Sequence, residues 1–221
     1  AFLLEKGYIF NKLDSNNIDR FKEICRKIQL TEGLDKKFLA KNPWDFANFM
    51  FIKKQFPKAK FVFIHGHPYP FLNSSLRALR TLTNKKTVYS DLISPMAKKL
   101  SENPIMKNIS KMLLYHKFPF ALPLIVEHHS NQINYFMTNL KQLKKEDYIN
   151  IKYESLCSKP VRTMKNIFDF LGVEEKNPER FRKIVKPRNL NIGSDVKQIK
   201  NYIYQRMEPY FSFFNYSKHL V

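Results

Sequence analysis

The stretch KNPWDFANFMFIKKQFPKAKFVFIHGHPYPFLNSSLRALR, residues 41–80, decides the fold of this chain. Residues 61–64 (Phe-Val-Phe-Ile) form an apolar run that is too short for a helix and is typical of a buried central strand. The pattern predicts a helix before this strand, over residues 44–56, and another after it, over residues 71–83. A strand that ends in a glycine turn, here at Gly66, and leads into a helix is where α/β proteins bind phosphate. Free backbone N–H groups and the helix dipole both point at the ligand there.

Further along the chain, the pattern predicts mostly helices around one more short strand. Residues 148–152 alternate between apolar and polar side chains and indicate that strand. Two strands among helices favour an α/β layer fold with a small parallel sheet. The predicted helices cover residues 18–29, 123–145, 160–171 and 196–207, with Gly33 and Gly172 as stop signals, and residues 90–120 in pieces interrupted by prolines.

Two blocks of the chain resemble segments of the PAPS-dependent sulfotransferase family. The first block consists of Lys41-Asn42-Pro43, Phe-Pro-Lys-Ala-Lys-Phe at residues 56–61, Pro68-Tyr69 and Ser74. The second consists of Tyr-Ile-Asn-Ile-Lys-Tyr-Glu-Ser-Leu at residues 148–156, Pro160, and Ile-Phe-Asp-Phe-Leu-Gly at residues 167–172. Both blocks stand in the family's order, and the resemblance spans residues 18–190.

The resemblance implies a P-loop-like α/β sulfotransferase fold, in which helices flank a small parallel sheet. It implies one domain over residues 1–221, with residues 1–15 as a tail. The expected activity is transfer of a sulfonate group from PAPS (3′-phosphoadenosine 5′-phosphosulfate) to a hydroxyl or amine acceptor. PAPS or its product PAP is the expected nucleotide. Sulfuryl transfer resembles phosphoryl transfer in depending mainly on positioning and positive charge.

The resemblance also implies roles for individual residues. Lys41 matches the family's lysine near the sulfonate, although a solvated surface lysine is the alternative. Ser74 matches the serine that binds the 3′-phosphate, and its alternative role is a helix cap. Ser75 takes its place if the register shifts by one. Tyr153 matches the tyrosine near the adenine, and Arg188 falls where a basic loop closes on the 3′-phosphate.

His65 and His67 flank Gly66. Side chains two apart on a strand share one face, so this pair raises the question of a metal site. No third ligand is evident nearby, so we predict no metal. For His67 we favour a contact with a phosphate of the nucleotide.

Two departures from the family's pattern bear on activity. Gly66 stands where the family has an arginine that binds the 3′-phosphate, a contact of about 1.5–3 kcal/mol. Arg77 and Arg80 on the following helix are candidates to replace it. The five glycines form no cluster of the kind that cradles the 5′-phosphosulfate. The chain is therefore expected to be either a fragment of a larger enzyme or a fold that has lost this loop.

The net charge is +20, from 39 Lys and Arg against 19 Asp and Glu. It indicates an anionic partner, such as a nucleotide, a sulfated or phosphorylated substrate, nucleic acid or an acidic membrane face, unless it reflects a compositional bias of the genome. The alternative function is an inactive sulfotransferase-like fold that serves as a basic binding or assembly subunit for RNA or protein. An unrelated nucleic-acid-binding domain ranks last, because the chain has none of the recognised motifs.

The rest of the composition says little about the compartment and the substrate of the protein. Cys25 and Cys157 form no metal-ligand or redox spacing and are predicted to be free thiols, which favours a reducing intracellular compartment. No apolar run approaches the ~18 residues of a membrane span. We expect residues 85–125 to shape the acceptor pocket, whose ligand the sequence leaves open.

Overall fold

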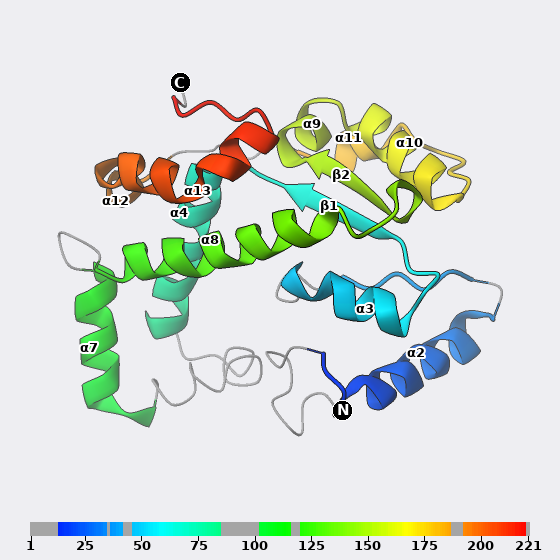
Figure 1. Cartoon of the computed structure of the whole chain (residues 1–221), viewed down its shortest axis with the longest axis horizontal. Helices are drawn as coiled ribbons and strands as arrows, with labels where there is room; N and C mark the ends of the chain where they lie inside the picture. Colours follow the sequence, from blue (N-terminus) through cyan, green and yellow to red (C-terminus); the bar gives the residue numbers. More distant parts are fainter. Residues whose placement is uncertain are drawn as a thin grey trace.

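The computed structural model describes residues 13–34, 36–41, 46–84, 102–115, 120–186 and 192–219. Within these ranges helices surround a two-stranded sheet (Figure 1). The elements are α2 (Ile18–Glu32), η2 (Phe46–Asn48), α3 (Phe49–Gln55), β1 (Phe61–His65), α4 (Pro68–Asn84), α7 (Pro104–Tyr115), α8 (Ala121–Leu140), η3 (Lys145–Asp147), β2 (Tyr148–Lys152), α9 (Tyr153–Ser158), α10 (Pro160–Leu171), α11 (Arg180–Ile184), α12 (Ser194–Gln198) and α13 (Lys200–Phe213).

The two strands are parallel, with Phe61 opposite Tyr148 and His65 opposite Lys152. The small parallel sheet flanked by helices is confirmed. The expectation that residues 61–64 form a buried central strand is wrong for the described ranges. Phe63 and His65 are buried, whereas Ile64 between them is 53% exposed. The sheet has two strands in these ranges, and the alternation shows that only one face of β1 packs into the core.

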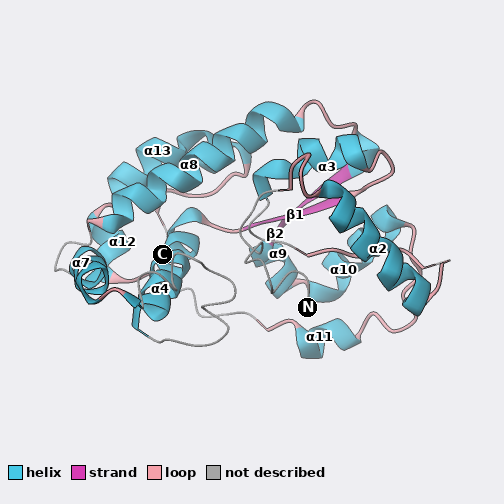
Figure 2. Ribbon diagram, turned by 90° about the horizontal axis from the view of Figure 1, so that it is seen from below, coloured by secondary structure: helices cyan, strands magenta, loops and turns pink. Residues whose placement is uncertain are grey.

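Helices cover the sheet from separate directions. α8 runs alongside α13 and contacts α4, while α9 and α10 pack beside β2 (Figures 1 and 2). Aromatic side chains fill the space between β1, α3 and α8. The rings of Phe63 and Phe136 are 5.0 Å apart between centroids, and Phe49 lies 5.4 Å from Phe63. All three are buried, and their nearly perpendicular rings make the edge-to-face contacts that aromatic pairs favour.

α10 shows how local sequence sets an element's limits. Pro160 occupies its first turn, where a missing N–H costs nothing. Gly172 ends it in the left-handed conformation, with φ of 60°, which a glycine adopts without a steric penalty. The predicted bounds are therefore confirmed. Two lysines from distant segments bind the last carbonyls. Lys37 donates to Leu171 O at 2.6 Å, and Lys60 donates to Phe170 O at 2.6 Å.

Several predicted helices have other limits. The helix predicted over residues 44–56 is, within the described residues, the short η2 followed by α3, which ends at Gln55. The helix predicted over residues 18–29 continues to Glu32. α4 begins at Pro68 instead of residue 71, because a proline suits the first turn of a helix. α8 ends at Leu140 instead of residue 145. A turn follows Leu140 and places Leu143 in the core. The helix predicted over residues 196–207 is two helices, α12 and α13, which meet at Ile199.

Several other expectations concern parts that the structure describes incompletely. Arg188, residues 1–12 of the predicted tail, and residues 85–101 and 116–119 of the predicted acceptor-pocket segment lie outside the described residues. Cys25 is buried, Cys157 is half-buried and both are free thiols. No helix in the described ranges is long and apolar enough to cross a membrane.

Candidate functional site

The carboxyl ends of β1 and β2 bring the two sequence blocks together at one edge of the sheet. Gly66 and His67 follow β1, and Tyr153 and Glu154 follow β2. A Cβ atom placed on Gly66 would lie 3.9 Å from the Cβ of Tyr153, an ordinary van der Waals separation. Ligands of α/β proteins bind beyond this end of a parallel sheet. We therefore take this edge as the candidate site.

Glu154 is the central polar group of the edge. Its Oε1 accepts a hydrogen bond from the backbone N–H of His67 at 2.9 Å. Its Oε2 lies 3.0 Å from the hydroxyl of Tyr216, which also lies 3.2 Å from the carbonyl oxygen of His65 and can donate its proton to either. Burial, and after it the negative charge of Glu154, raises the pKa of Tyr216, so this hydroxyl stays protonated as a donor. The carboxylate thus links the start of α4 to the C-terminal segment.

His67 is 7% exposed, and both of its ring nitrogens have partners. Nε2 donates to the carbonyl oxygen of Ser217 at 2.9 Å, and Nδ1 accepts from the backbone N–H of Tyr69 at 3.3 Å. Desolvation lowers the pKa of His67, against the opposing effect of its hydrogen bond to Ser217, so the neutral imidazole is favoured. These contacts occupy the nitrogens that the predicted contact with a nucleotide phosphate would use.

The first turn of α4 offers no free N–H group to an anion. Pro68 and Pro70 have none, Tyr69 donates to His67 Nδ1, and Phe71 donates to the carbonyl oxygen of His67 at 3.2 Å. The prediction that backbone N–H groups bind phosphate here is therefore wrong. The two prolines and the His67 ring take up the groups on which that prediction relied.

His65 is a buried core residue. Its Nε2 donates to Asn150 Oδ1 at 2.9 Å, and its ring centroid lies 3.9 Å from that of Phe214. Desolvation lowers the pKa of His65 to about 4, although the bond to Asn150 acts in the opposite direction. The rings of His65 and His67 thus engage different partners. In the described ranges, no group of three or more His, Cys, Asp or Glu residues could hold a metal ion.

The other predicted site residues differ in their exposure and in their distance from the sheet edge. Tyr153 is half-buried beside Gly66 at the sheet edge. Ser74 is exposed in the second turn of α4 and Ser75 is half-buried next to it, so neither caps the helix. Lys41 is exposed between α2 and η2.

Of the two arginines considered as substitutes at position 66, Arg80 is fully engaged elsewhere. Its Nη1 donates to Asp195 Oδ2 at 2.8 Å, and its Nε and Nη2 donate to Leu114 O at 2.8 and 2.7 Å. The guanidinium group thereby joins α4 to α7 and α12. Arg77 is exposed on the same helix.

The sequence analysis missed the C-terminal segment of residues 216–218, which closes this edge. Besides the contacts of Tyr216 and Ser217, the carbonyl oxygen of Lys218 accepts from the hydroxyl of Tyr69 at 3.1 Å. Lys152 Nζ lies 4.9 Å from the centroid of the Tyr216 ring. The aromatic composition of the end of the chain was its only signal in the sequence.

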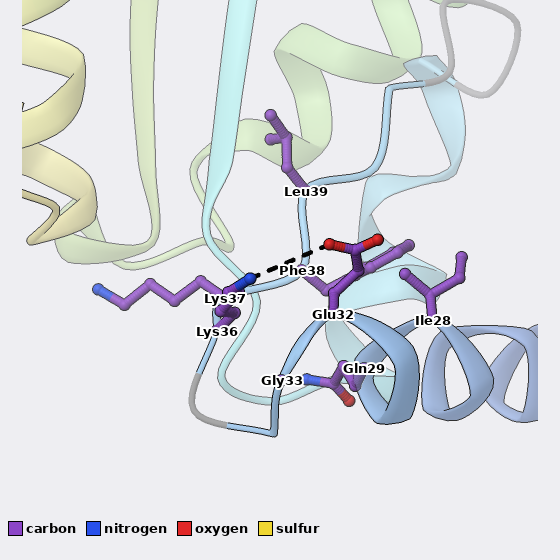
Figure 3. Close-up of a pocket in the computed structure, with 8 residues that line it drawn as sticks. All are labelled: Ile28, Gln29, Glu32, Gly33, Lys36, Lys37, Phe38 and Leu39. Carbon is purple, nitrogen blue, oxygen red and sulfur yellow. Dashed lines mark ion pairs between the residues drawn. The ribbon is translucent and has the colours of Figure 1, made fainter.

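A small pocket of about 250 Å³ lies at the end of α2 (Figure 3). Glu32 and Lys36 form an ion pair across it at 4.0 Å, and Phe38 and Leu39 contribute apolar surface. It contains none of the predicted site residues and none of the residues at the sheet edge. We therefore do not assign it to the candidate site.

The model of the sulfotransferase family matches residues 115–177. This stretch contains α8, β2, α9 and α10, and with them the second block of the resemblance. The resemblance to the sulfotransferase family is confirmed, and the α/β arrangement of the structure agrees with it. No curated protein matches the chain, and no solved structure matches it.

Proposed function

We propose that this chain is a sulfotransferase that moves a sulfonate group from PAPS to a hydroxyl or amine acceptor. One observation carries the proposal. Residue Tyr153, in the stretch that matches the family, lies beside Gly66 of the first block at the carboxyl edge of a parallel sheet. The two blocks were recognised separately in the sequence, and the fold joins them where α/β proteins bind nucleotides.

In this proposal the nucleotide is held by side chains. The first turn of α4 has no free N–H group, so the hydroxyl of Ser74 binds the 3′-phosphate without help from the backbone of that turn. Ser74 is exposed and therefore accessible to a ligand. Tyr153 packs near the adenine, Arg188 contributes positive charge at the 3′-phosphate and Lys41 at the sulfonate. Ser75 is the substitute for Ser74.

PAPS supplies the activated sulfonate group, and the chain supplies positioning and positive charge. Because Lys41 is exposed on a segment that follows α2, its role requires this segment to meet the nucleotide at the sheet edge. Substitution of Lys41 therefore distinguishes an effect on the rate of sulfonate transfer from an effect on the binding of PAP. Lys41→Ala is expected to lower the rate of sulfonate transfer while leaving the affinity for PAP nearly unchanged.

The second candidate is an inactive sulfotransferase-like fold that acts as a basic binding or assembly subunit for RNA or protein. Two observations favour it. Gly66 provides no side chain for the 3′-phosphate, and the polar groups of His67 and Glu154 are already bonded within the chain. The net charge of +20 suits an acidic partner.

Calorimetric titration with PAP distinguishes the two candidates. The sulfotransferase proposal predicts micromolar binding that persists at moderate salt and is weakened about tenfold by Ser74→Ala, the loss of roughly one hydrogen bond to a charged group. Ser110→Ala, at a serine within α7, is the matched control and should bind as the unmodified chain does. No binding at millimolar PAP would contradict the proposal and favour the binding subunit, which an RNA-binding assay then tests.

A further inference from the structure

A second pocket lies between the start of α13, the C-terminal segment and α4. Its volume is about 330 Å³, at the lower end of the range for small-ligand sites. None of its residues belongs to the predicted site or to the stretch that matches the family. The residues that line it are Tyr69, Lys200, Asn201, Tyr204, Gln205, Lys218 and His219.

The pocket has positive charge and, among its described lining residues, no carboxylate. Lys200 Nζ lies 5.2 Å from the centroid of the Tyr69 ring, and Lys218 Nζ lies 5.9 Å from that of Tyr204. Aromatic rings attract ammonium groups without neutralising them. In the described ranges neither lysine forms an ion pair with a carboxylate. Within the described part of the chain, both positive charges beside the pocket thus have no paired carboxylate.

The start of α13 adds neutral donors beside these charges. Lys200 and Tyr204 are four residues apart on the helix, as are Asn201 and Gln205, so these four side chains share one face. The amide groups of Asn201 and Gln205 can each donate two hydrogen bonds. The pocket thus combines two ammonium groups with two amides, a set of donors suited to an anion with several oxygen acceptors.

The pocket adjoins the sheet edge through Tyr69. The Tyr69 ring lies 5.0 Å from that of His67, and its hydroxyl donates to the carbonyl oxygen of Lys218. Desolvation lowers the pKa of His67, and the positive charge of Lys200 acts in the same direction as a smaller contribution. An anion in the pocket would therefore lie close to the candidate site without using its residues.

We propose that this pocket binds a small sulfate or phosphate monoester through its oxyanion group. Such a group is tetrahedral and accepts hydrogen bonds in several directions, which matches donors that come from α13 and from the C-terminal segment. The inference goes beyond the proposed function, because it requires neither PAPS nor sulfonate transfer.

Titration with phenyl phosphate and with inorganic phosphate at low salt tests the inference. Calorimetry measures the affinity, and the NMR signals of His219 and Gln205 report where the ligand binds. We expect saturable binding of both ligands with shifts of these signals. Lys200→Gln and Lys218→Gln remove the charge and keep a polar side chain that is one atom shorter, and each should weaken binding about tenfold. Lys197→Gln, at an exposed lysine of α12, is the control and should change affinity less than twofold.

Three outcomes would overturn the inference. They are the absence of binding at phosphate concentrations on the order of 10 mM, equal affinity in all variants, and equal weakening by Lys197→Gln, which would show attraction to general surface charge. Circular dichroism of each variant confirms that it is folded. Ser74→Ala should leave phenyl phosphate binding unchanged, so that failure of the PAP proposal and failure of this one are separate results.

Discussion

Glu154 accepts a hydrogen bond from the backbone N–H of His67 at 2.9 Å, across a separation of 87 positions in the chain. The bond joins the residues that follow the two strands, because β1 and β2 are parallel and end at the same edge. The same carboxylate lies 3.0 Å from the Tyr216 hydroxyl and so also holds the C-terminal segment. One side chain thus fixes three parts of the chain around the candidate site.

Replacing Glu154 should destabilise the protein. Glu154→Ala leaves the His67 N–H without a partner and releases Tyr216, and an unsatisfied buried group costs about 1–3 kcal/mol. We expect the free energy of unfolding, measured by urea denaturation, to fall by about that amount. Glu154→Gln keeps an acceptor and should cost less. The exposed Glu146 provides the control, and equal effects of Glu154→Ala and Glu146→Ala would contradict this role.

Stability should decrease as the pH is lowered from about 6.5 towards 4. His65 has a pKa lowered from 6.5 to about 4, so the unfolded chain binds a proton in this interval and the folded chain does not. The free energy of unfolding then falls by up to about 1.4 kcal/mol per pH unit for this residue. His67 and His129, whose pKa values are also lowered, act in the same direction. Urea denaturation at several pH values measures the slope.

The variant His65→Gln isolates the contribution of that histidine. Its dependence of stability on pH should be shallower than that of the unmodified chain, because one titrating group is lost. Identical slopes in the chain and in His65→Gln would show that His65 does not titrate differently on folding.

Arg80 and Arg77 lie on the same helix but should differ strongly in their effect on stability. Arg80→Ala removes the bonds to Asp195 and Leu114 that join α4 to α7 and α12, and hydrogen bonds of charged groups contribute about 1.5–3 kcal/mol. Arg77→Ala, at an exposed position, should change stability by less than about 0.5 kcal/mol. Thermal unfolding of both variants provides the measurement. Similar melting temperatures would refute the structural role of Arg80.

Phe136→Ala should be among the most destabilising single substitutions in α8. Its side chain is fully buried against Phe49 and Phe63, and truncation of a buried Phe costs about 3–5 kcal/mol. Leu124→Ala, at a residue of the same helix that is 70% exposed, is the matched control and should have little effect. Urea denaturation compares the two, and a cost below about 1 kcal/mol for Phe136→Ala would argue against this packing.

Gly66→Arg tests whether the arginine that the family has at this position would strengthen nucleotide binding here. A Cβ atom at position 66 has, among the described residues, only the Cβ of Tyr153 within 4 Å, at 3.9 Å, and the backbone there is not in the left-handed region, so the variant should fold. If PAP binds at this edge, the new guanidinium should strengthen its binding about tenfold or more, as measured by calorimetry. Gly66→Gln, which adds length without charge, is the control. An unchanged affinity in Gly66→Arg would place the nucleotide elsewhere.

Much of the fold follows from local patterns. The apolar run at residues 61–64 and the alternation at residues 148–152 predicted both strands of the sheet, and α10 has its predicted limits. These predictions succeeded because short periodic patterns, a proline at a helix start and a left-handed glycine at its end act within a few residues. The family resemblance on the second block was likewise readable from the sequence and is confirmed.

The contacts of the candidate site could not be predicted from local sequence patterns in the same way. The pattern at Gly66 predicted free N–H groups for phosphate, whereas the structure bonds them to the His67 ring and backbone or replaces them by prolines. Ser74 had a sequence signal as a cap, but a start at Pro68 places it within the helix. The predicted roles of Lys41, Ser74, Ser75, Tyr153 and Arg188 remain predictions.

The sequence by itself determined the two strands, most of the helices, the strong positive charge and the resemblance to sulfotransferases, because each depends on residues close together in the chain or on composition. Only the tertiary structure decided that Glu154 meets His67, that residues 216–218 close the sheet edge and that Lys200 and Lys218 share a pocket with Tyr69. These contacts join positions as many as 151 residues apart. Such pairings depend on the packing of whole helices and strands, which no local pattern specifies.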